Sequence, residues 1–153
     1  MDLRLPGMSG IEAIGEIRKE FPASRLIVVT TYHGDVDVNK AFQAGASSYI
    51  LKEMFGEELL KAIRTVHTGK RYIPPSVANS LYDHYDQPEL TPRELDVLQL
   101  IAAGNSNRQI ADTLGLTEGS VKFYVNRILS KLNAHDRTQA LAIAVRRGFV
   151  HFD

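Results

Sequence analysis

The sequence of 153 residues predicts part of a doubly wound parallel α/β sheet, followed by an all-α bundle of four helices. Before residue 70, segments with helical apolar spacing alternate with two short β-branched segments, which is typical of a parallel sheet covered by helices. After residue 90, four helix-capping motifs follow one another with no strand-like segment between them. Residues 70–89 hold three prolines and little periodicity. We therefore expect one domain over residues 1–69, a linker over 70–89 and a second domain over 90–153.

The elements of the first part follow from capping residues, apolar spacing and glycine stops. Ser9 and Glu12 have the spacing of a capping box, so a helix is expected to begin after Ser9 and to end near Phe21. Short β-branched segments predict buried strands, and the later helices are expected to stop at Gly45 and Gly69. In order, the expected elements are a helix over 11–21, a strand over 26–29, a helix over 36–44, a strand over 48–51 and a helix over 56–67.

Four helices are expected in the second part, each marked by an N-cap and a stop. Thr91 is followed by Pro92 at the first helical position and by Glu94, which is placed to reach back to the cap. The other expected N-caps are Ser106, Thr117 and Asp136. The expected stops are Gly104, Gly115, Asn133 and Gly148. Within residues 70–89, the segment 76–82 can form one short helix.

Composition excludes several classes of protein. The 18 basic and 18 acidic residues balance, which excludes a generic polycation or an acidic solvating tail. The absence of cysteine excludes a disulfide framework and a thiolate zinc site, and it fits a reducing compartment. The longest strongly apolar segments, 26–29 and 140–145, are far shorter than the roughly 20 residues that span a bilayer. We therefore expect a cytoplasmic protein that does not associate with membranes.

The helix expected over residues 118–132 has one apolar and one polar face. The apolar stripe consists of Val121, Val125, Ile128, Leu129 and Leu132. The opposite face carries Lys122, Phe123, Asn126, Arg127 and Ser130, with Lys131 at its flank. No acid follows Glu118 on this helix, so its polar face does not repel phosphate. With the helix over 106–114 before it, this helix predicts a helix-turn-helix that fits the major groove of DNA. An ordinary solvated face and a protein partner for Phe123 remain alternative interpretations.

Four residues of the first part are placed to handle a phosphoryl group. Thr30 and Lys52 lie at the ends of the two expected strands, Tyr49 lies three residues before Lys52, and Asp2 precedes a Pro-Gly turn. In an open α/β sheet, ligand chemistry gathers at the carboxyl ends of the strands. A carboxylate, a hydroxyl and an ammonium there can receive, hydrogen-bond and charge-pair with a phosphoryl group. Taken singly, these residues also fit a turn, a helix cap and a solvated lysine.

The motifs after residue 90 resemble the LuxR-type helix-turn-helix domain. The segments that carry the resemblance are LTPRE (90–94), VL (97–98), AGNSNRQIA (103–111), TEGSVK (117–122), ILSKL (128–132) and DRTQA (136–140). The resemblance implies that base edges of DNA are contacted by Lys122, Phe123 and Asn126. It implies that the phosphate backbone is contacted by Thr117, Ser120, Tyr124, Arg127 and Lys131. It also implies that the last helix, from Arg137 on, is available for dimer contact.

The first part resembles the flavodoxin-like receiver domain of a two-component response regulator, and both parts together resemble the NarL/FixJ family. The resemblance implies that Asp2 is the phosphoacceptor, Thr30 the switch hydroxyl, Lys52 the phosphate-contacting lysine and Tyr49 the aromatic that reports the switch. The acidic pair that holds magnesium in receivers has no counterpart in the sequence. We therefore expect a receiver truncated at its N-terminus, by a misassigned start or as a fragment, with Asp2 as a weak Mg²⁺ ligand and no firmly bound cofactor.

The implied function is a bacterial transcriptional regulator of a two-component phosphorelay that binds double-stranded DNA. We expect a homodimer on an inverted-repeat operator, and a sensor histidine kinase as the partner of the full-length form. One alternative is a fragment that binds DNA independently of phosphorylation or forms heterodimers with full-length relatives. An enzyme is not expected, because the five histidines are scattered without ligand spacing and no nucleophile motif or Gly-rich phosphate loop accompanies them.

Overall fold

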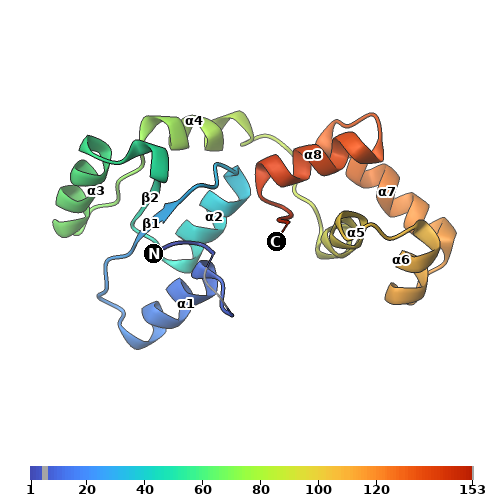
Figure 1. The fold of residues 1–153 in the computed structure, drawn as a ribbon, viewed down its shortest axis with the longest axis horizontal. Helices are drawn as coiled ribbons and strands as arrows, with labels where there is room; N and C mark the ends of the chain where they lie inside the picture. Colours follow the sequence, from blue (N-terminus) through green and yellow to red (C-terminus); the bar gives the residue numbers. More distant parts are fainter. Residues whose placement is uncertain (5–6, 153) are drawn as a thin grey trace. The chain divides into compact units, whose positions relative to one another are not determined.

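The computed structural model describes residues 1–4 and 7–152, and the chain divides into two compact units, Met1–Tyr85 and Asp86–Asp153 (Figure 1). Leu5, Pro6 and Asp153 lie outside the described residues, and so does part of the Pro-Gly turn expected after Asp2. Among the residues that are described, no helix is both long and apolar enough to cross a membrane.

The first unit alternates helices with two short strands, as the sequence predicts. In chain order its elements are α1 (Gly10–Glu20), β1 (Ile27–Thr30), α2 (Asp35–Ala44), β2 (Ser48–Leu51), the 3-10 helix η1 (Lys52–Met54), α3 (Glu57–His67) and α4 (Pro75–Asp83). The capping box of α1 is complete, because the Glu12 N–H donates to Ser9 Oγ and the Ser9 N–H donates to Glu12 Oε2. Gly45 ends α2 in the left-handed conformation, with a φ of 114°.

The sheet is parallel, so both strands end at the same edge. β1 pairs with β2, and Thr30 lies opposite Leu51 at that edge. The backbone of Met1 lies along the other side of β1, where its carbonyl accepts the Val29 N–H at 2.8 Å. Asp2 therefore follows a segment that runs beside β1 toward the carboxyl ends of the strands.

Helices cover both faces of this sheet (Figure 1). On one face, α1, α2 and α4 pack in one buried cluster with Val28, Tyr49 and Leu51 of the strands. Side chains alternate between the faces along a strand, so the buried Ile50 belongs to the other face, where α3 lies against both strands. Burial on both sides explains why the strand sequences are continuous apolar segments.

Part of the segment expected to be a linker folds onto the first unit. α4 begins at Pro75, where the missing N–H of proline removes no helical hydrogen bond. Val77 is buried in the same cluster as α1 and α2, and Leu81 packs against it. These two side chains lie four residues apart and give α4 one apolar face, which is the physical reason why residues 75–83 differ from an extended linker.

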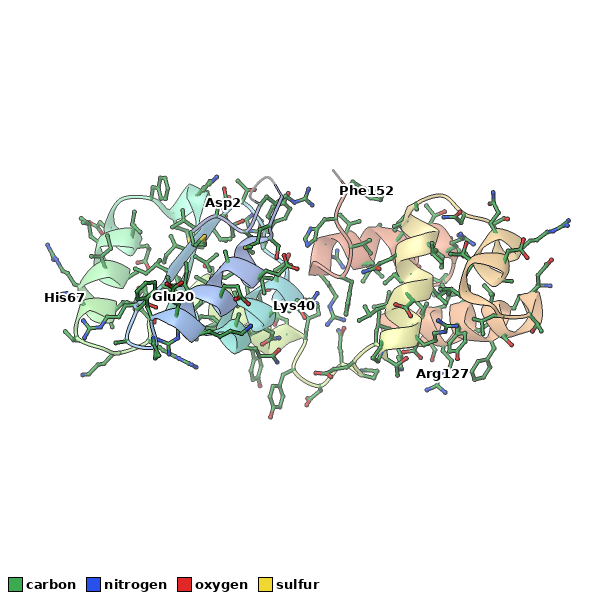
Figure 2. The ribbon with its side chains drawn as sticks, turned by 90° about the horizontal axis from the view of Figure 1, so that it is seen from below. Asp2, Glu20, Lys40, His67, Arg127 and Phe152 are labelled. Carbon is green, nitrogen blue, oxygen red and sulfur yellow. The ribbon has the colours of Figure 1, made fainter. Side chains whose placement is uncertain are left out.

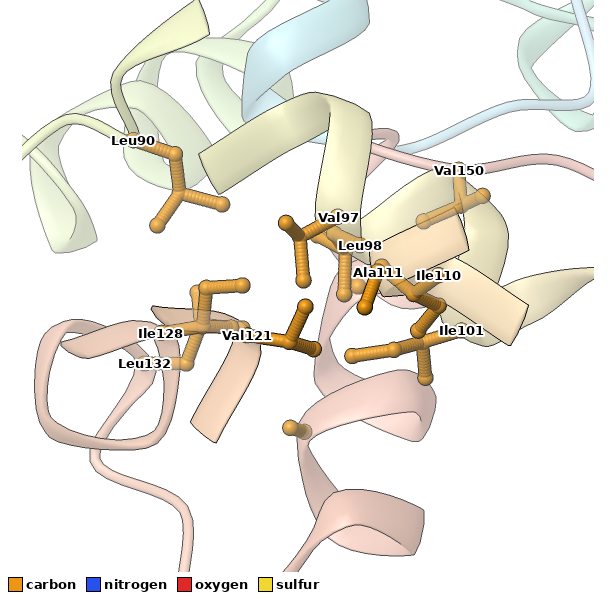
Figure 3. Close-up of a cluster of buried hydrophobic side chains, with 12 residues drawn as sticks. Leu90, Val97, Leu98, Ile101, Ile110, Ala111, Val121, Ile128, Leu132 and Val150 are labelled. Atoms are coloured by element: carbon orange, nitrogen blue, oxygen red, sulfur yellow. The ribbon is translucent and has the colours of Figure 1, made fainter. Parts of the chain in front are cut away.

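The second unit is a bundle of four helices, as predicted. They are α5 (Pro92–Ala102), α6 (Asn107–Leu114), α7 (Glu118–Leu132) and α8 (Arg137–Arg147). The capping boxes of α5 and α6 are complete, and Asn133 ends α7 with a φ of 51°. The apolar faces meet in one core, drawn in Figure 3. Its buried members are Leu90, Val97, Leu98, Ile101, Ile110, Ala111, Val121, Ile128, Leu132, Ala140, Ala144 and Val150.

Candidate functional site

Asp2 and Lys52 form an ion pair at the carboxyl edge of the sheet. Lys52 is the first residue after β2, and its Nζ lies 2.5 Å from Asp2 Oδ2. Asp2 Oδ1 accepts a weaker hydrogen bond from the Arg4 N–H at 3.4 Å. The fold thus brings together two of the four residues that the sequence singled out at this edge, 50 positions apart in the chain. Asp2 is labelled in Figure 2.

The surroundings of Asp2 keep its carboxylate ionised. Partial burial raises the pKa of Asp2, but the hydrogen bonds from Lys52 and from the Arg4 N–H outweigh burial and hold the pKa below its usual value. The Asp2 side chain remains 30% exposed. An ionised, partly accessible carboxylate is the form that can act as a nucleophile toward a phosphoryl group.

Thr30 and Tyr49, the other two residues predicted at this edge, are fully buried, and both bond to the backbone of Tyr32. Thr30 Oγ1 accepts the Tyr32 N–H at 3.4 Å, and the Tyr49 hydroxyl donates to the Tyr32 carbonyl at 2.9 Å. Burial raises the pKa of Tyr49 far above its usual range, and the charges of Asp37 and Asp2 raise it further. The hydroxyl of Tyr49 therefore stays protonated and acts as a hydrogen-bond donor.

Gly10 is required for the position of Asp2. A Cβ atom at Gly10 would lie 2.1 Å from the Asp2 carbonyl oxygen and 2.6 Å from Leu3 Cα. The Gly10 N–H also donates to the Leu3 carbonyl at 2.7 Å. Only glycine permits this approach of α1 to the segment that carries Asp2.

The described side chains do not fit a magnesium site. Within residues 1–4 and 7–152, no three His, Cys, Asp or Glu side chains gather where they can hold a metal ion. Asp2, the one metal ligand that the sequence suggested, is paired with the ammonium of Lys52. A hard divalent cation needs several oxygen ligands, and a single carboxylate bound to a lysine does not supply them.

The second unit contains the predicted helix-turn-helix. Gly115, whose φ is 64°, is the C-cap of α6, and Thr117, two residues later, is the N-cap of α7. Thr117 Oγ1 accepts the Ser120 N–H at 3.1 Å, and the two hydroxyl oxygens lie 2.9 Å apart. These hydroxyls lie at the N-terminus of α7, where the helix dipole favours an anion.

The three residues expected to contact bases share the exposed side of α7. Lys122 and Asn126 are exposed one turn apart, and Phe123 between them is 56% exposed. Tyr124 is half-buried and packs against the core, and its ring meets the Phe123 ring edge-on, with 5.8 Å between the ring centroids. Lysine, asparagine and phenylalanine are side chains that can contact base edges in the major groove.

Arg127 and Lys131, expected to contact phosphates, both bond to Glu94 of α5. Arg127 Nε lies 3.1 Å from Glu94 Oε1, and the Arg127 side chain stays half-exposed (Figure 2). Lys131 Nζ lies 2.7 Å from Glu94 Oε2 and 2.8 Å from the Glu89 carbonyl oxygen, and only 16% of its side chain is exposed. The ammonium of Lys131 therefore joins α7 to α5 and to residue 89, and its contact with phosphate stays a prediction.

Two family models match the chain. The model described as "Response regulator receiver domain" covers residues 1–64, and the one described as "Bacterial regulatory proteins, luxR family" covers residues 88–144. The chain is 34% identical over 164 positions to transcriptional regulatory protein LnrK of Bacillus subtilis (strain 168), and the match covers 97% of this chain and 74% of LnrK. The chain belongs to the response regulators with a LuxR-type DNA-binding domain. The family and the fold class predicted from the sequence are thereby confirmed.

Further relatives and solved structures agree with this family. The uncharacterized transcriptional regulatory protein YhcZ of the same Bacillus subtilis strain is 42% identical over 155 positions, which cover 95% of this response regulator and 72% of YhcZ. The structure of two RcsB dimers bound to two parallel DNAs is similar with a TM-score of 0.66 and 26% identity, over 95% of this chain and 72% of RcsB.

The last helix of this response regulator offers only part of the apolar surface expected for dimer contact. Ala144, one of three apolar candidates there, is fully buried in the core of the second unit. Leu141 and Val145 are half-buried and lie four residues apart on α8. They are the candidates that remain accessible to a partner.

Three residues that contact the candidate sites were not assigned to them from the sequence. Glu94 and Gly10 were assigned only to helix starts. A capping motif predicts the bonds within one helix start, but it does not show which other element packs against that start. Tyr32, whose ring lies under the Arg4 guanidinium at 4.9 Å, belongs to no motif. Its position two residues after a strand end was the one signal available.

Proposed function

We propose that this response regulator is a sequence-specific DNA-binding regulator of transcription whose α7 enters the major groove. The observation that carries the proposal is the exposed side of α7, which presents Lys122, Phe123 and Asn126 and holds no acid after Glu118. A bundle that supports such a helix behind a short turn has the geometry of a groove-reading unit. The similarity to RcsB, which was solved in complex with DNA, supports the same assignment.

Each residue predicted to contact DNA then has a role. Lys122, Phe123 and Asn126 contact base edges, and the phosphate backbone is contacted by Thr117, Ser120, Tyr124 and Arg127. Lys131 is assigned to holding α7 against α5, because its ammonium is bonded to Glu94 and to the Glu89 carbonyl. A regulator that acts on bacterial DNA works in the cytoplasm, and we propose that location.

Selection of duplexes from a random pool by the full chain tests the proposal. We expect the selection to enrich one sequence, which the full chain binds far more strongly than an unselected duplex in a gel-shift assay. We also expect the affinity to fall steeply as the salt concentration rises. A pool that shows no enrichment after repeated rounds, or binding that salt does not weaken, contradicts the proposal.

For the first unit we propose that Asp2 occupies the phosphoacceptor position. The ionised carboxylate and its ion pair with Lys52 support this role, and a sensor histidine kinase is the proposed donor. An Asp2 oxygen would attack the phosphorus of the donor's phosphohistidine, so that a P–O bond forms, the P–N bond breaks and the histidine leaves. Thr30 and Tyr49 would report the added charge through their bonds to the Tyr32 backbone.

A second candidate is a regulator that binds DNA independently of phosphorylation. It is favoured by the lack of a metal-holding group among the described side chains. Incubation with acetyl phosphate and Mg²⁺ separates the candidates. The second candidate predicts that DNA affinity stays unchanged and that mass spectrometry shows little phosphoaspartate. Clear phosphorylation of Asp2 with a change in affinity would instead favour the phosphorelay.

We also propose a homodimer on an inverted repeat. One helix reads only a few base pairs, so two copies related by a twofold axis lengthen the recognised site. Leu141 and Val145 on α8 are the proposed contact residues. A heterodimer with a full-length relative would use the same surface, and mixing the two proteins before size-exclusion chromatography distinguishes it.

A further inference from the structure

Glu94 is a buried carboxylate in the middle of the DNA-binding unit. Only 1% of it is exposed, and its oxygens accept hydrogen bonds from three sides. The donors are the Thr91 N–H at 2.8 Å, Lys131 Nζ at 2.7 Å and Arg127 Nε at 3.1 Å. A charge removed from water is tolerated only when it is paired and hydrogen-bonded in this way. Glu94 is therefore a fixed anion under α7.

Arg127 is held on two sides but keeps its outer nitrogens available. Its Nε is bonded to Glu94, and its guanidinium lies over the Phe123 ring, with 5.6 Å between Cζ and the ring centroid. Within the described part of the chain, Nη1 and Nη2 make no hydrogen bond, and half of the side chain is exposed. A planar guanidinium fixed at Nε can still donate two parallel hydrogen bonds through its outer edge.

We infer that Glu94 is a positioning residue for DNA binding, which orients the Arg127 guanidinium toward a phosphate from inside the bundle. The inference rests on the proposed DNA-binding function. Glu94 carries one negative charge against the two positive charges of Arg127 and Lys131, so one net positive charge remains for the phosphate. Because the side chain is ordered before DNA arrives, less conformational entropy is lost when the contact forms.

The variant Glu94→Gln separates this positioning role from two simpler roles of Glu94, which are capping α5 and repelling phosphate. The capping box of α6 already uses a glutamine, since Gln109 Oε1 accepts the Ser106 N–H at 2.8 Å, so a glutamine at position 94 can keep the cap. The substitution also removes a negative charge that lies beneath the side of α7 proposed to face DNA. Simple electrostatics therefore predicts tighter binding, whereas loss of positioning predicts weaker binding.

Fluorescence anisotropy of the full chain with a random-sequence duplex measures the effect in two backgrounds. We expect Glu94→Gln to weaken binding about five- to tenfold in the natural chain and to cause no weakening when Arg127 is already alanine. Glu12→Gln, the same change in the capping box of α1, is the matched control and should leave binding unchanged. Unchanged or tighter binding by Glu94→Gln, or equal weakening in both backgrounds, would overturn the inference.

Arg127→Lys keeps the inference testable if Glu94→Gln does not fold. The half-exposed position tolerates lysine, which keeps the charge but cannot bond Glu94 and grip a phosphate with two parallel donors. Binding should weaken about as much as in Arg127→Ala. Binding equal to that of the natural chain would overturn the inference while leaving the proposed function intact. A natural chain that fails to bind the duplex at low salt contradicts the proposed function and the inference together.

Discussion

Lys122 and Asn126 lie one turn apart on the exposed side of α7, whereas Arg127 is anchored beside them to Glu94. Contacts to base edges discriminate between sequences, and contacts to phosphates do not. Lys122→Ala or Asn126→Ala should therefore cost about 1–3 kcal/mol on the selected duplex and little on a random one. Arg127→Ala should weaken both duplexes alike and reduce the salt slope. Competition binding with the two duplexes checks this, and identical behaviour of all three variants would refute the groove assignment.

Glu94 also gives the second unit a predictable response to acid. Burial raises the pKa of Glu94, but the hydrogen bonds from Lys131 and Thr91 outweigh burial and hold the pKa below the ordinary value of 4.5. Ionised Glu94 therefore stabilises the fold fully above pH 4.5, and this contribution is lost as pH falls through the lower folded-state pKa. Thermal unfolding of Glu94→Gln and of the natural chain should differ most above pH 4.5 and converge below it. A difference that does not depend on pH would contradict this account.

At the level of the helices and strands, local signals in the sequence were sufficient for most starts and stops. Ser9, Thr91 and Ser106 each begin a helix with a completed capping box, because these bonds lie within four residues of one another. The helix α4 was only partly foreseen, since Pro74 and Pro75 favour a linker and its apolar face matters only once α2 is in place. Tertiary packing decided that case.

Gly10 and Gly15 of α1 make a matched pair for testing how the fold positions Asp2. A Cβ at Gly10 meets the backbone of Asp2 and Leu3, whereas nothing lies within 4 Å of a Cβ at Gly15. Gly10→Ala should destabilise the first unit by about 1–3 kcal/mol, because backbone must move to admit the methyl group. Gly15→Ala should stabilise it by about 0.5–1 kcal/mol through helix propensity. Chemical denaturation measures both, and a Gly10→Ala variant as stable as Gly15→Ala would show that residues 2–3 are not held as described.

The candidate sites could be predicted only in part, because the sequence shows contacts between residues that are close in the chain but not contacts between different helices. Periodicity and capping placed Lys122 and Asn126 on one exposed side, since helix geometry fixes which residues share a face. The same reasoning could not show that Lys131 is bonded to Glu94, 37 residues earlier, because that contact exists only when α5 and α7 pack together. Side-chain contacts between two helices, such as the one between Lys131 and Glu94, can be known only from the tertiary structure.

On the scale of the whole molecule, the proposed dimer makes a prediction about α8. Val145 is half-buried and a candidate contact, whereas Ala142 on the same helix is exposed. Val145→Asp should prevent two copies from binding together, so that only a weak complex on single half-sites remains. The control variant Ala142→Asp should bind as the natural chain does. Footprinting on the selected duplex should show two half-sites about one helical turn apart for the natural chain. Protection of a single half-site at saturating protein would refute the dimer.

A single salt series distinguishes sequence recognition by this response regulator from non-specific attraction to DNA. The dissociation constants of the full chain for the selected duplex and for a random duplex are measured over the same range of salt. If α7 reads the groove, affinity for both duplexes falls linearly on logarithmic axes, and the selected duplex is bound at least about a thousandfold more tightly throughout. Equal affinity for the two duplexes at every salt concentration would contradict groove reading by α7.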